Sequence, residues 1–238
     1  MLSLHWLVAI CGLASAAYIS EFKSSDIIQH VGEPVGTEKV HDGVTMYITP
    51  ASQAKDPKMA VLYLTDAFGL PLLENRLLAD SFARAGFTTV MPDIFRGDPA
   101  PHDITFDADE FLAKHTTNVT DPVIETTIRY MHMPFVSSVK VGGADIGFAA
   151  HPSFLQDDEV LDISGPASIA AAEIDTLFEP ARRFEVEGML NQTAQPYQIA
   201  LYSGTFHGFG TRANISNPEQ KFAKEEAFFQ AVRWFKAW

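Results

Sequence analysis

Two apolar stretches of the 238-residue chain have the composition of buried β-strands, yet only four residues separate them. They cover 139–141 and Ile146–Ala150, in a chain that otherwise alternates strand-like and helix-like segments. Parallel neighbours in one sheet need a crossover of roughly a dozen residues or more, usually a helix. The two stretches therefore either merge into one long strand, or 139–141 leaves the sheet, and we favour the merge or a near-merge.

The remaining pattern predicts an α/β fold, with a mostly parallel sheet and helices on both faces. Short apolar runs alternate with segments of helical period, which is typical of strands buried on both sides. A strand–helix crossover is missing near 141–146, which should remove one strand and leave a void or exposed apolar surface. The expected strands are 44–48, 60–64, 87–91, 146–150, 167–171 and 198–202, and the expected helices are 72–85, 107–114, 122–132, 180–190 and 218–235.

The first seventeen residues differ from the rest of the chain. A short apolar run ends in the small residues ASAA (14–17), a pattern typical of a secretory signal peptide. The run is far shorter than the roughly 20 apolar residues of a membrane-spanning helix. We therefore predict a signal peptide at 1–17, a single domain at 18–238, secretion, and no membrane span in the mature chain.

Two further features bear on secretion. Asn118, Asn191 and Asn214 each begin an N-glycosylation tripeptide, so a secreted chain could carry glycans there. Cys11 is the sole cysteine and lies within the predicted signal. The mature chain would then have no disulfide, no thiolate metal site and no cysteine nucleophile.

Charge and histidine spacing exclude several classes of function. The chain carries 30 acidic and 17 basic residues, a net charge of −13, whereas nucleic acids and anionic membranes require a basic face. The histidines show no spacing typical of a metal-ligand set. We therefore expect no nucleic-acid partner, no metal and no cofactor.

Polar residues follow three of the expected strands, and they are Asp66, Asp175 and His207. In open parallel sheets the ligand site lies beyond the carboxyl ends of the strands. An Asp followed by a His gives the last two members of a nucleophile–acid–base order. In such a site the carboxylate orients the imidazole, and the imidazole takes the proton of the nucleophile. A surface carboxylate and a structurally bonded histidine are the alternative.

Five segments carry a resemblance to a known family. They are LTDAFGLP (64–71), PDIFRGD (92–98), AHPSF (150–154), AAAEID (170–175) and FHGF (206–209). From about Gly32 to the C-terminus the chain resembles the dienelactone hydrolase family of α/β-hydrolases, particularly its fungal-type members. The resemblance implies an α/β-hydrolase-like fold that hydrolyses small lactones or carboxylic esters by nucleophilic acyl transfer.

The same resemblance implies roles for individual residues. Asp175 and His207 match the acid and base of the family's catalytic triad. Asp66 matches the acidic position after an early strand, and the Ala67 amide matches a donor to the oxyanion.

Two arginines complete the predicted site. Arg212 matches a basic position that holds a substrate carboxylate, and Arg96 is a second candidate for that role. The alternative for Arg212 is a simple ion pair with neighbouring acids. The predicted partner is therefore a small lactone, ester or carboxylate, bound by a monomer.

The family's nucleophile has no counterpart in this chain. Its pattern is Gly-x-Cys-x-Gly on a tight strand-to-helix turn, and the sequence here is VGGAD (141–145). Ser137, Ser138 and Ser153 are the nearby hydroxyls, but none has the glycine frame of such a turn. We interpret Ser153 as a turn or cap residue and His151 as structural.

A triad without its nucleophile retains only binding and oxyanion effects, so turnover is expected at background level. Three interpretations follow for the whole chain. It is an impaired hydrolase of this type, a secreted non-catalytic binding protein with the same pocket, or a truncated product of splicing or of a misassigned coding sequence.

Overall fold

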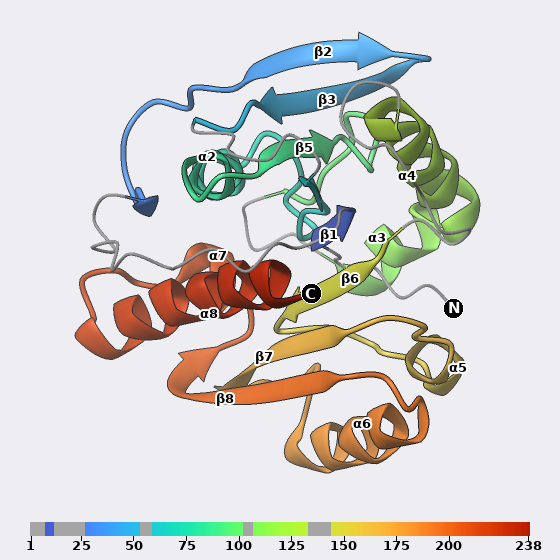
Figure 1. Cartoon of the computed structure of the whole chain (residues 1–238), viewed down its shortest axis with the longest axis vertical. Helices are drawn as coiled ribbons and strands as arrows, with labels where there is room; N and C mark the ends of the chain where they lie inside the picture. The colour runs from blue at the N-terminus through green and yellow to red at the C-terminus, as the bar shows by residue number, and fades with distance from the viewer. Residues whose placement is uncertain (1–7, 12–26, 53–58, 102–106, 133–143) are drawn as a thin grey trace.

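The computed structural model of the chain describes residues 8–11, 27–52, 59–101, 107–132 and 144–238. Figure 1 shows a twisted sheet with helices on both faces. The strands are β1 (Val8–Cys11), β2 (Thr37–His41), β3 (Val44–Thr49), β4 (Ala60–Tyr63), β5 (Thr88–Pro92), β6 (Ile146–Ala150), β7 (Ala167–Ile174) and β8 (Tyr197–Phe206). The helices are α2 (Leu73–Arg84), α3 (Ala108–Lys114), α4 (Thr117–His132), α5 (Asp157–Leu161), α6 (Pro180–Gln192), α7 (Phe209–Arg212) and α8 (Pro218–Ala237).

These strands form one eight-stranded sheet in the order β2-β3-β5-β4-β1-β6-β7-β8. The pairs β4/β5, β6/β7 and β7/β8 are parallel. The pairs β2/β3 and β3/β5 are antiparallel, as are both pairings of β1. The α/β-hydrolase-like fold with a parallel sheet covered by helices is therefore confirmed.

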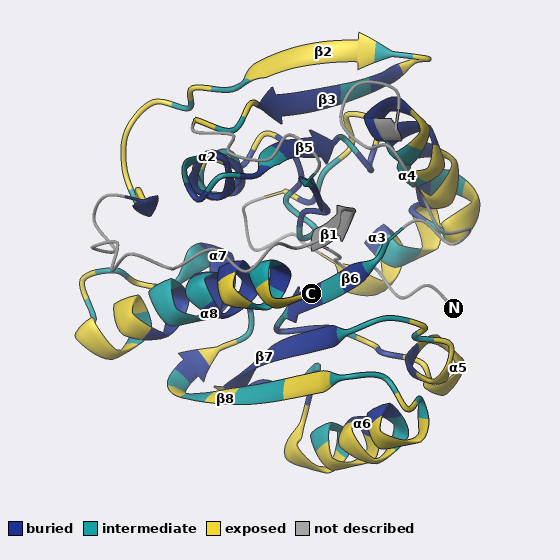
Figure 2. Cartoon of the chain, in the orientation of Figure 1, coloured by how far each residue is buried: buried dark blue, intermediate teal, exposed yellow. Residues whose placement is uncertain are grey.

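Every strand and helix expected in the body of the chain is present, with ends that differ by a few residues. The four elements that were not expected are β1, β2, α5 and α7. The edge strand β2 is exposed along most of its length (Figure 2), so it lacks the apolar pattern of a buried strand. Helix α4 begins at Thr117 and carries Pro122 inside it, whereas the sequence placed its start at the proline.

The buried strands alternate their side chains between two cores. In β4, Val61 and Tyr63 join one cluster with α2 and α8, whereas Leu62 joins another with α3 and α4. In β7, Ala170 belongs to the first cluster, and Ile169 faces α5 and α6. This period of two is the reason that short apolar runs form strands buried on both faces.

The centre of the sheet departs from the sequence-based expectation. Strand β6 begins at Ile146, and Ala144 and Asp145 lie outside any strand. The stretch 139–141 lies outside the described residues, so its merge or near-merge with β6 stays a prediction. Among the described residues no parallel strand stands between β4 and β6, and a different segment occupies that place. Between β4 and β6 runs β1, antiparallel to both, with Ile10 opposite Ile146. A strand drawn from within the predicted signal peptide therefore fills the place beside β6.

The two faces of the sheet also differ at this point. Among the described residues, the core under α2 and α8 runs without a break from Val61 to Phe148. On the opposite face the core divides into two clusters, one under α3 and α4 and one under α5 and α6. A cavity of about 490 Å³ lies between them, and Leu64, Ile124 and Ala149 are among its lining residues. The sequence predicted a void or exposed apolar surface near 141–146, and this cavity borders Ala144 and Ile146.

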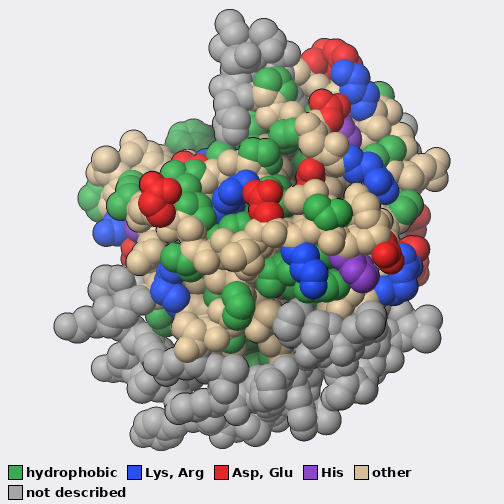
Figure 3. Space-filling model, turned by 90° about the horizontal axis from the view of Figure 1, so that it is seen from above, with side chains coloured by type: hydrophobic (Ala, Val, Ile, Leu, Met, Phe, Trp, Pro, Cys, Tyr) green, Lys and Arg blue, Asp and Glu red, His purple; other side chains and the backbone are tan. Residues whose placement is uncertain are grey.

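None of the described helices is long and apolar enough to cross a bilayer. Figure 3 views one face, on which Lys and Arg side chains are interspersed with Asp, Glu and hydrophobic groups. This mixture agrees with the net charge of −13 and with the absence of a basic stripe on that face.

Candidate active site

The parallel register of β7 and β8 brings the predicted acid and base together. Ile174 lies opposite Phe206 at the carboxyl ends of the two strands, so the next residue of each, Asp175 and His207, also become neighbours. The Nδ1 atom of His207 lies 3.1 and 3.0 Å from the two carboxylate oxygens of Asp175. Because a carboxylate only accepts hydrogen bonds, Nδ1 donates, and Nε2 is left with its lone pair as an acceptor.

The carboxylate of Asp175 is held firmly in place. Its Oδ1 atom accepts hydrogen bonds from the backbone N–H groups of Leu177, at 2.9 Å, and Phe178, at 3.2 Å. The Asp175 side chain is fully buried, whereas that of His207 is 28% exposed. A fixed, buried carboxylate behind a partly open imidazole is the arrangement that a general base requires.

Ser153 lies on the other side of the imidazole. Its Oγ atom is 3.3 Å from Nε2 of His207. The residue follows β6 in a turn in which His151 and Phe154 both have left-handed backbones, with φ of 41° and 53°. The sequence-based interpretation as a turn residue is correct for the backbone but missed the partner of the hydroxyl.

His151 packs against the base without sharing its proton path. The two rings of His151 and His207 meet edge to face, with centroids 4.9 Å apart. Burial lowers the pKa of His151 well below the ordinary value of histidine, and electrostatic interactions with His207 and Arg212 lower that pKa further. His151 is therefore a neutral, buried ring that supports the imidazole of His207.

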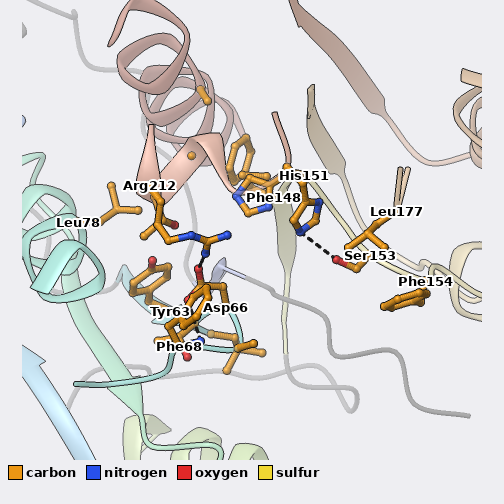
Figure 4. A pocket seen from close by; sticks show the side chains of 18 of the residues that line it. Tyr63, Asp66, Phe68, Leu78, Phe148, His151, Ser153, Phe154, Leu177 and Arg212 are labelled. Atoms are coloured by element: carbon orange, nitrogen blue, oxygen red, sulfur yellow. Dashed lines mark hydrogen bonds and ion pairs between the residues drawn. The ribbon is translucent and has the colours of Figure 1, made fainter. Parts of the chain in front are cut away.

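Asp66 and Arg212 form a second polar group at the same edge of the sheet (Figure 4). The guanidinium of Arg212 makes an ion pair with Asp66 through Nη1 and Oδ2, and it lies 4.5 Å above the ring of Phe68. The other oxygen of Asp66 accepts hydrogen bonds from the amide of Asn75, at 3.1 Å, and from the backbone of Phe68, at 3.3 Å. A side chain at Gly208, where φ is 89°, would collide with the guanidinium. Both predicted roles of Arg212, as substrate contact and as partner of an acid, are compatible with this placement.

A cavity of about 370 Å³ joins these two groups. Its polar lining includes Asp66, Ser153, His207 and Arg212, and Ala67 lies in the same wall. The remaining lining is mostly apolar and aromatic, with Tyr63, Phe68, Phe82, Phe111, Phe148, Phe154 and Phe228 among its members. A space of this size with a few converging polar groups suits a small organic ligand.

The other predicted residues lie away from this cavity. Arg96 is exposed in the turn after β5, with φ of 52°, and does not line it, so the structure does not bring Arg96 together with Arg212. Asn118, Asn191 and Asn214 are all exposed, as acceptors of a glycan must be.

The backbone of Cys11 lies at the opposite end of β4 from the site. Strand β1 runs antiparallel to β4, so Cys11 lies opposite Ala60, at the amino end of β4. The site lies beyond the carboxyl end of β4, where Asp66 follows Tyr63. Within the described ranges no group of three or more His, Cys, Asp or Glu side chains could hold a metal ion.

Comparison with known proteins agrees with the fold. The profile of the dienelactone hydrolase family matches residues 44–148 and 131–238. The chain belongs to the dienelactone hydrolase family. The two matches overlap at 131–148.

Individual relatives cover most of the chain. The hydrolase pyvD of Aspergillus violaceofuscus is 37% identical over 226 residues, which is 87% of this chain and 91% of that protein. Dienlactone hydrolase 2 of Gibberella moniliformis is 28% identical over 216 residues, with 88% and 91% covered. A solved structure from Klebsiella pneumoniae, named as a candidate dienelactone hydrolase, superposes with a TM-score of 0.67 at 13% identity, covering 82% of this chain and 93% of that one. At that identity the superposition shows the fold alone.

Proposed function

We propose that this protein hydrolyses small carboxylic esters or lactones by acyl transfer, with His207 as general base and Asp175 as the residue that orients it. The observation that carries the proposal is the hydrogen-bonded Asp175–His207 pair, whose imidazole lines the cavity. Family membership and relatives named as dienlactone hydrolases support the same class of reaction.

The cavity supports a small substrate. Its volume of about 370 Å³ lies near the lower end of the range for ligand pockets, roughly 300–1,000 Å³. The apolar and aromatic walls favour a ring or a short hydrocarbon chain, and Arg212 offers the one positive charge among its lining residues. We therefore propose a lactone or ester with an apolar body and, at one end, a carboxylate.

Lack of a thiol in the site supports the alternative of a non-catalytic binding protein. For that reason the sequence predicts ester turnover at background level, and a measurement of turnover tests this prediction against the proposed hydrolase. The contact of Ser153 with His207 argues for catalysis instead. Binding of a small dicarboxylate by calorimetry, lost in Arg212→Ala and unaccompanied by ester turnover, would favour the binding protein.

The decisive experiment compares ester and lactone turnover by the full-length protein with that of His207→Ala. His41→Ala, which removes a histidine outside the cavity, is the matched control. Under the proposal the native protein and the control hydrolyse p-nitrophenyl acetate and a small lactone roughly 10³-fold or more faster than His207→Ala. Equal rates in all three would refute a hydrolase.

We also propose that the protein acts as a secreted, glycosylated monomer. The apolar start of the chain and the exposed Asn118, Asn191 and Asn214 support this proposal. The position of β1 in the sheet opposes cleavage after residue 17, because cleavage would remove that strand.

A further inference from the structure

We propose that Ser153 is the nucleophile of this site, in place of the cysteine that the chain lacks. The inference rests on the hydrolase function proposed above and adds the residue that forms the covalent intermediate. Its basis is the 3.3 Å contact between Oγ of Ser153 and Nε2 of His207, on the side of the ring opposite Asp175.

The three side chains have the relationship of a serine triad. Oγ of Ser153 meets Nε2, and the buried carboxylate of Asp175 meets Nδ1, so the imidazole lies between its two partners. Along the chain they occur as Ser153, Asp175, His207, which is the nucleophile–acid–base order of α/β-hydrolases. They follow β6, β7 and β8, which are successive neighbours in the sheet.

The backbone around Ser153 presents the hydroxyl at the edge of the sheet without the usual glycine frame. His151 continues the sheet by donating its N–H to the carbonyl of Ala170, at 2.7 Å. Left-handed backbones at His151 and Phe154 then turn the chain sharply on both sides of Ser153. Bulky residues rarely adopt this conformation, and such strain gathers at active sites.

Ser153 also has the access that a nucleophile needs. It is half-buried and lines the cavity together with His207, Ala67 and Arg212. A substrate carbonyl in this space would lie beside the hydroxyl, and the Ala67 amide predicted from the sequence is the candidate donor to its oxygen.

The reaction balances with water as the only co-reactant. Nε2 of His207 takes the hydroxyl proton as Oγ of Ser153 bonds to the carbonyl carbon. The tetrahedral intermediate collapses, the C–O bond to the leaving alkoxide breaks, and His207 returns the proton to that alkoxide. A water molecule then loses a proton to His207 and attacks the carbonyl carbon of the acyl-serine. The bond between that carbon and Oγ breaks as His207 returns the proton to Oγ, which releases the carboxylic acid and restores the Ser153 hydroxyl.

The test uses a fluorophosphonate probe, which phosphonylates activated serines, on the full-length protein. We expect one adduct per chain, mapped to Ser153 by peptide mass spectrometry and absent from Ser153→Ala and His207→Ala. Ser203→Ala, which removes an exposed serine that bonds to Glu219, is the matched control and should label normally. An adduct on another serine, Ser137 or Ser138 included, or no adduct, would overturn the inference.

Turnover separates this inference from the proposed function. Ser153→Ala should lower kcat/KM by roughly 10³-fold or more. Ser153→Cys should keep measurable turnover, and iodoacetamide should abolish that turnover by alkylating the new thiol. Turnover would not depend on the thiol if residue 153 were only part of a turn. If the native protein outpaces His207→Ala but Ser153→Ala is equally fast, the hydrolase stands and Ser153 is excluded. If no variant turns over while Ser153 labels in a His207-dependent manner, the serine is confirmed and the hydrolase is wrong.

Discussion

The β7–β8 edge and the centre of the sheet are assembled from different parts of the chain. At the edge, two parallel strands in register deliver Asp175 and His207 to adjacent positions, and local sequence decides the result. At the centre, the strand beside β6 is β1, which enters antiparallel from the far N-terminal end of the chain. The site therefore combines a side that depends on local register with one that depends on a distant segment.

This difference affects chemistry and stability separately. The acid–base pair needs only β7, β8 and the residues that follow them. The cavity needs the centre as well, because Tyr63 and Phe148, which line it, both lie opposite Val8 of β1. Damage at the edge should abolish turnover and leave the fold, whereas damage at the centre should weaken the fold first.

The largest expected effect is at the edge. Asp175→Asn should lower kcat by roughly 10⁴-fold, because an amide no longer holds His207 in the tautomer that leaves Nε2 as acceptor. Asp109→Asn, an exposed change on α3, is the control and should leave kcat unchanged. Steady-state ester hydrolysis measures both. A loss of less than tenfold in Asp175→Asn would show that the pair is not the catalytic machinery.

The next effect tests the centre. Deletion of residues 1–11 removes β1, whereas deletion of 1–7 leaves it. Backbone groups of β4 and β6 would lose their partners, at about 1–3 kcal/mol for each that stays buried, so a loss of about 4 kcal/mol is expected. That corresponds to a melting temperature lower by roughly 8–16 °C for a chain of this size.

Equal melting temperatures for the two shortened chains would mean that β1 is dispensable and would favour cleavage as a signal peptide. Intact-mass measurement of the protein recovered from culture medium gives an independent answer. A secreted form that begins at residue 17 or 18 would show that the sheet closes without β1.

A third effect tests the link between the two regions, because Arg212 follows β8 while its partner Asp66 follows β4. Arg212→Gln should raise KM about 30-fold for an ester that bears a carboxylate, since a hydrogen bond to a charged group contributes about 2 kcal/mol. KM for a neutral ester should change little. Arg96→Gln, outside the cavity, is the matched control. Equal changes for both esters would make Arg212 a structural partner of Asp66 only.

The sequence predicted the edge well and the centre poorly, for a physical reason. Asp175 and His207 follow apolar strands whose parallel pairing is a short-range consequence of the α/β pattern. The entry of β1 depends on pairing across more than a hundred residues, and its apolar run has the composition of a signal peptide. The Ser153–His207 contact was missed because motif reasoning required glycines, whereas the turn is made by His151 and Phe154.

The smallest expected effect concerns His151, which directly follows β6 and packs against His207. Its folded-state pKa is lowered, chiefly by burial, while an unfolded histidine titrates near about 6.5. Below about pH 6.5 the imidazole of His151 therefore binds a proton in the unfolded chain but stays neutral in the folded chain. The stability associated with the neutral ring is complete above that pH and is lost as the pH falls, at no more than about 1.4 kcal/mol per pH unit.

Urea unfolding at pH 7.5 and pH 5.5 measures this loss. The native protein should lose about 1 kcal/mol more between the two pH values than His151→Gln does, because glutamine takes no proton. His41→Gln, which removes a more exposed histidine, should keep the pH dependence of the native protein. If His151→Gln also keeps the pH dependence of the native protein, protonation of the buried ring does not affect the free energy of unfolding. The acid sensitivity then arises from the carboxylates alone.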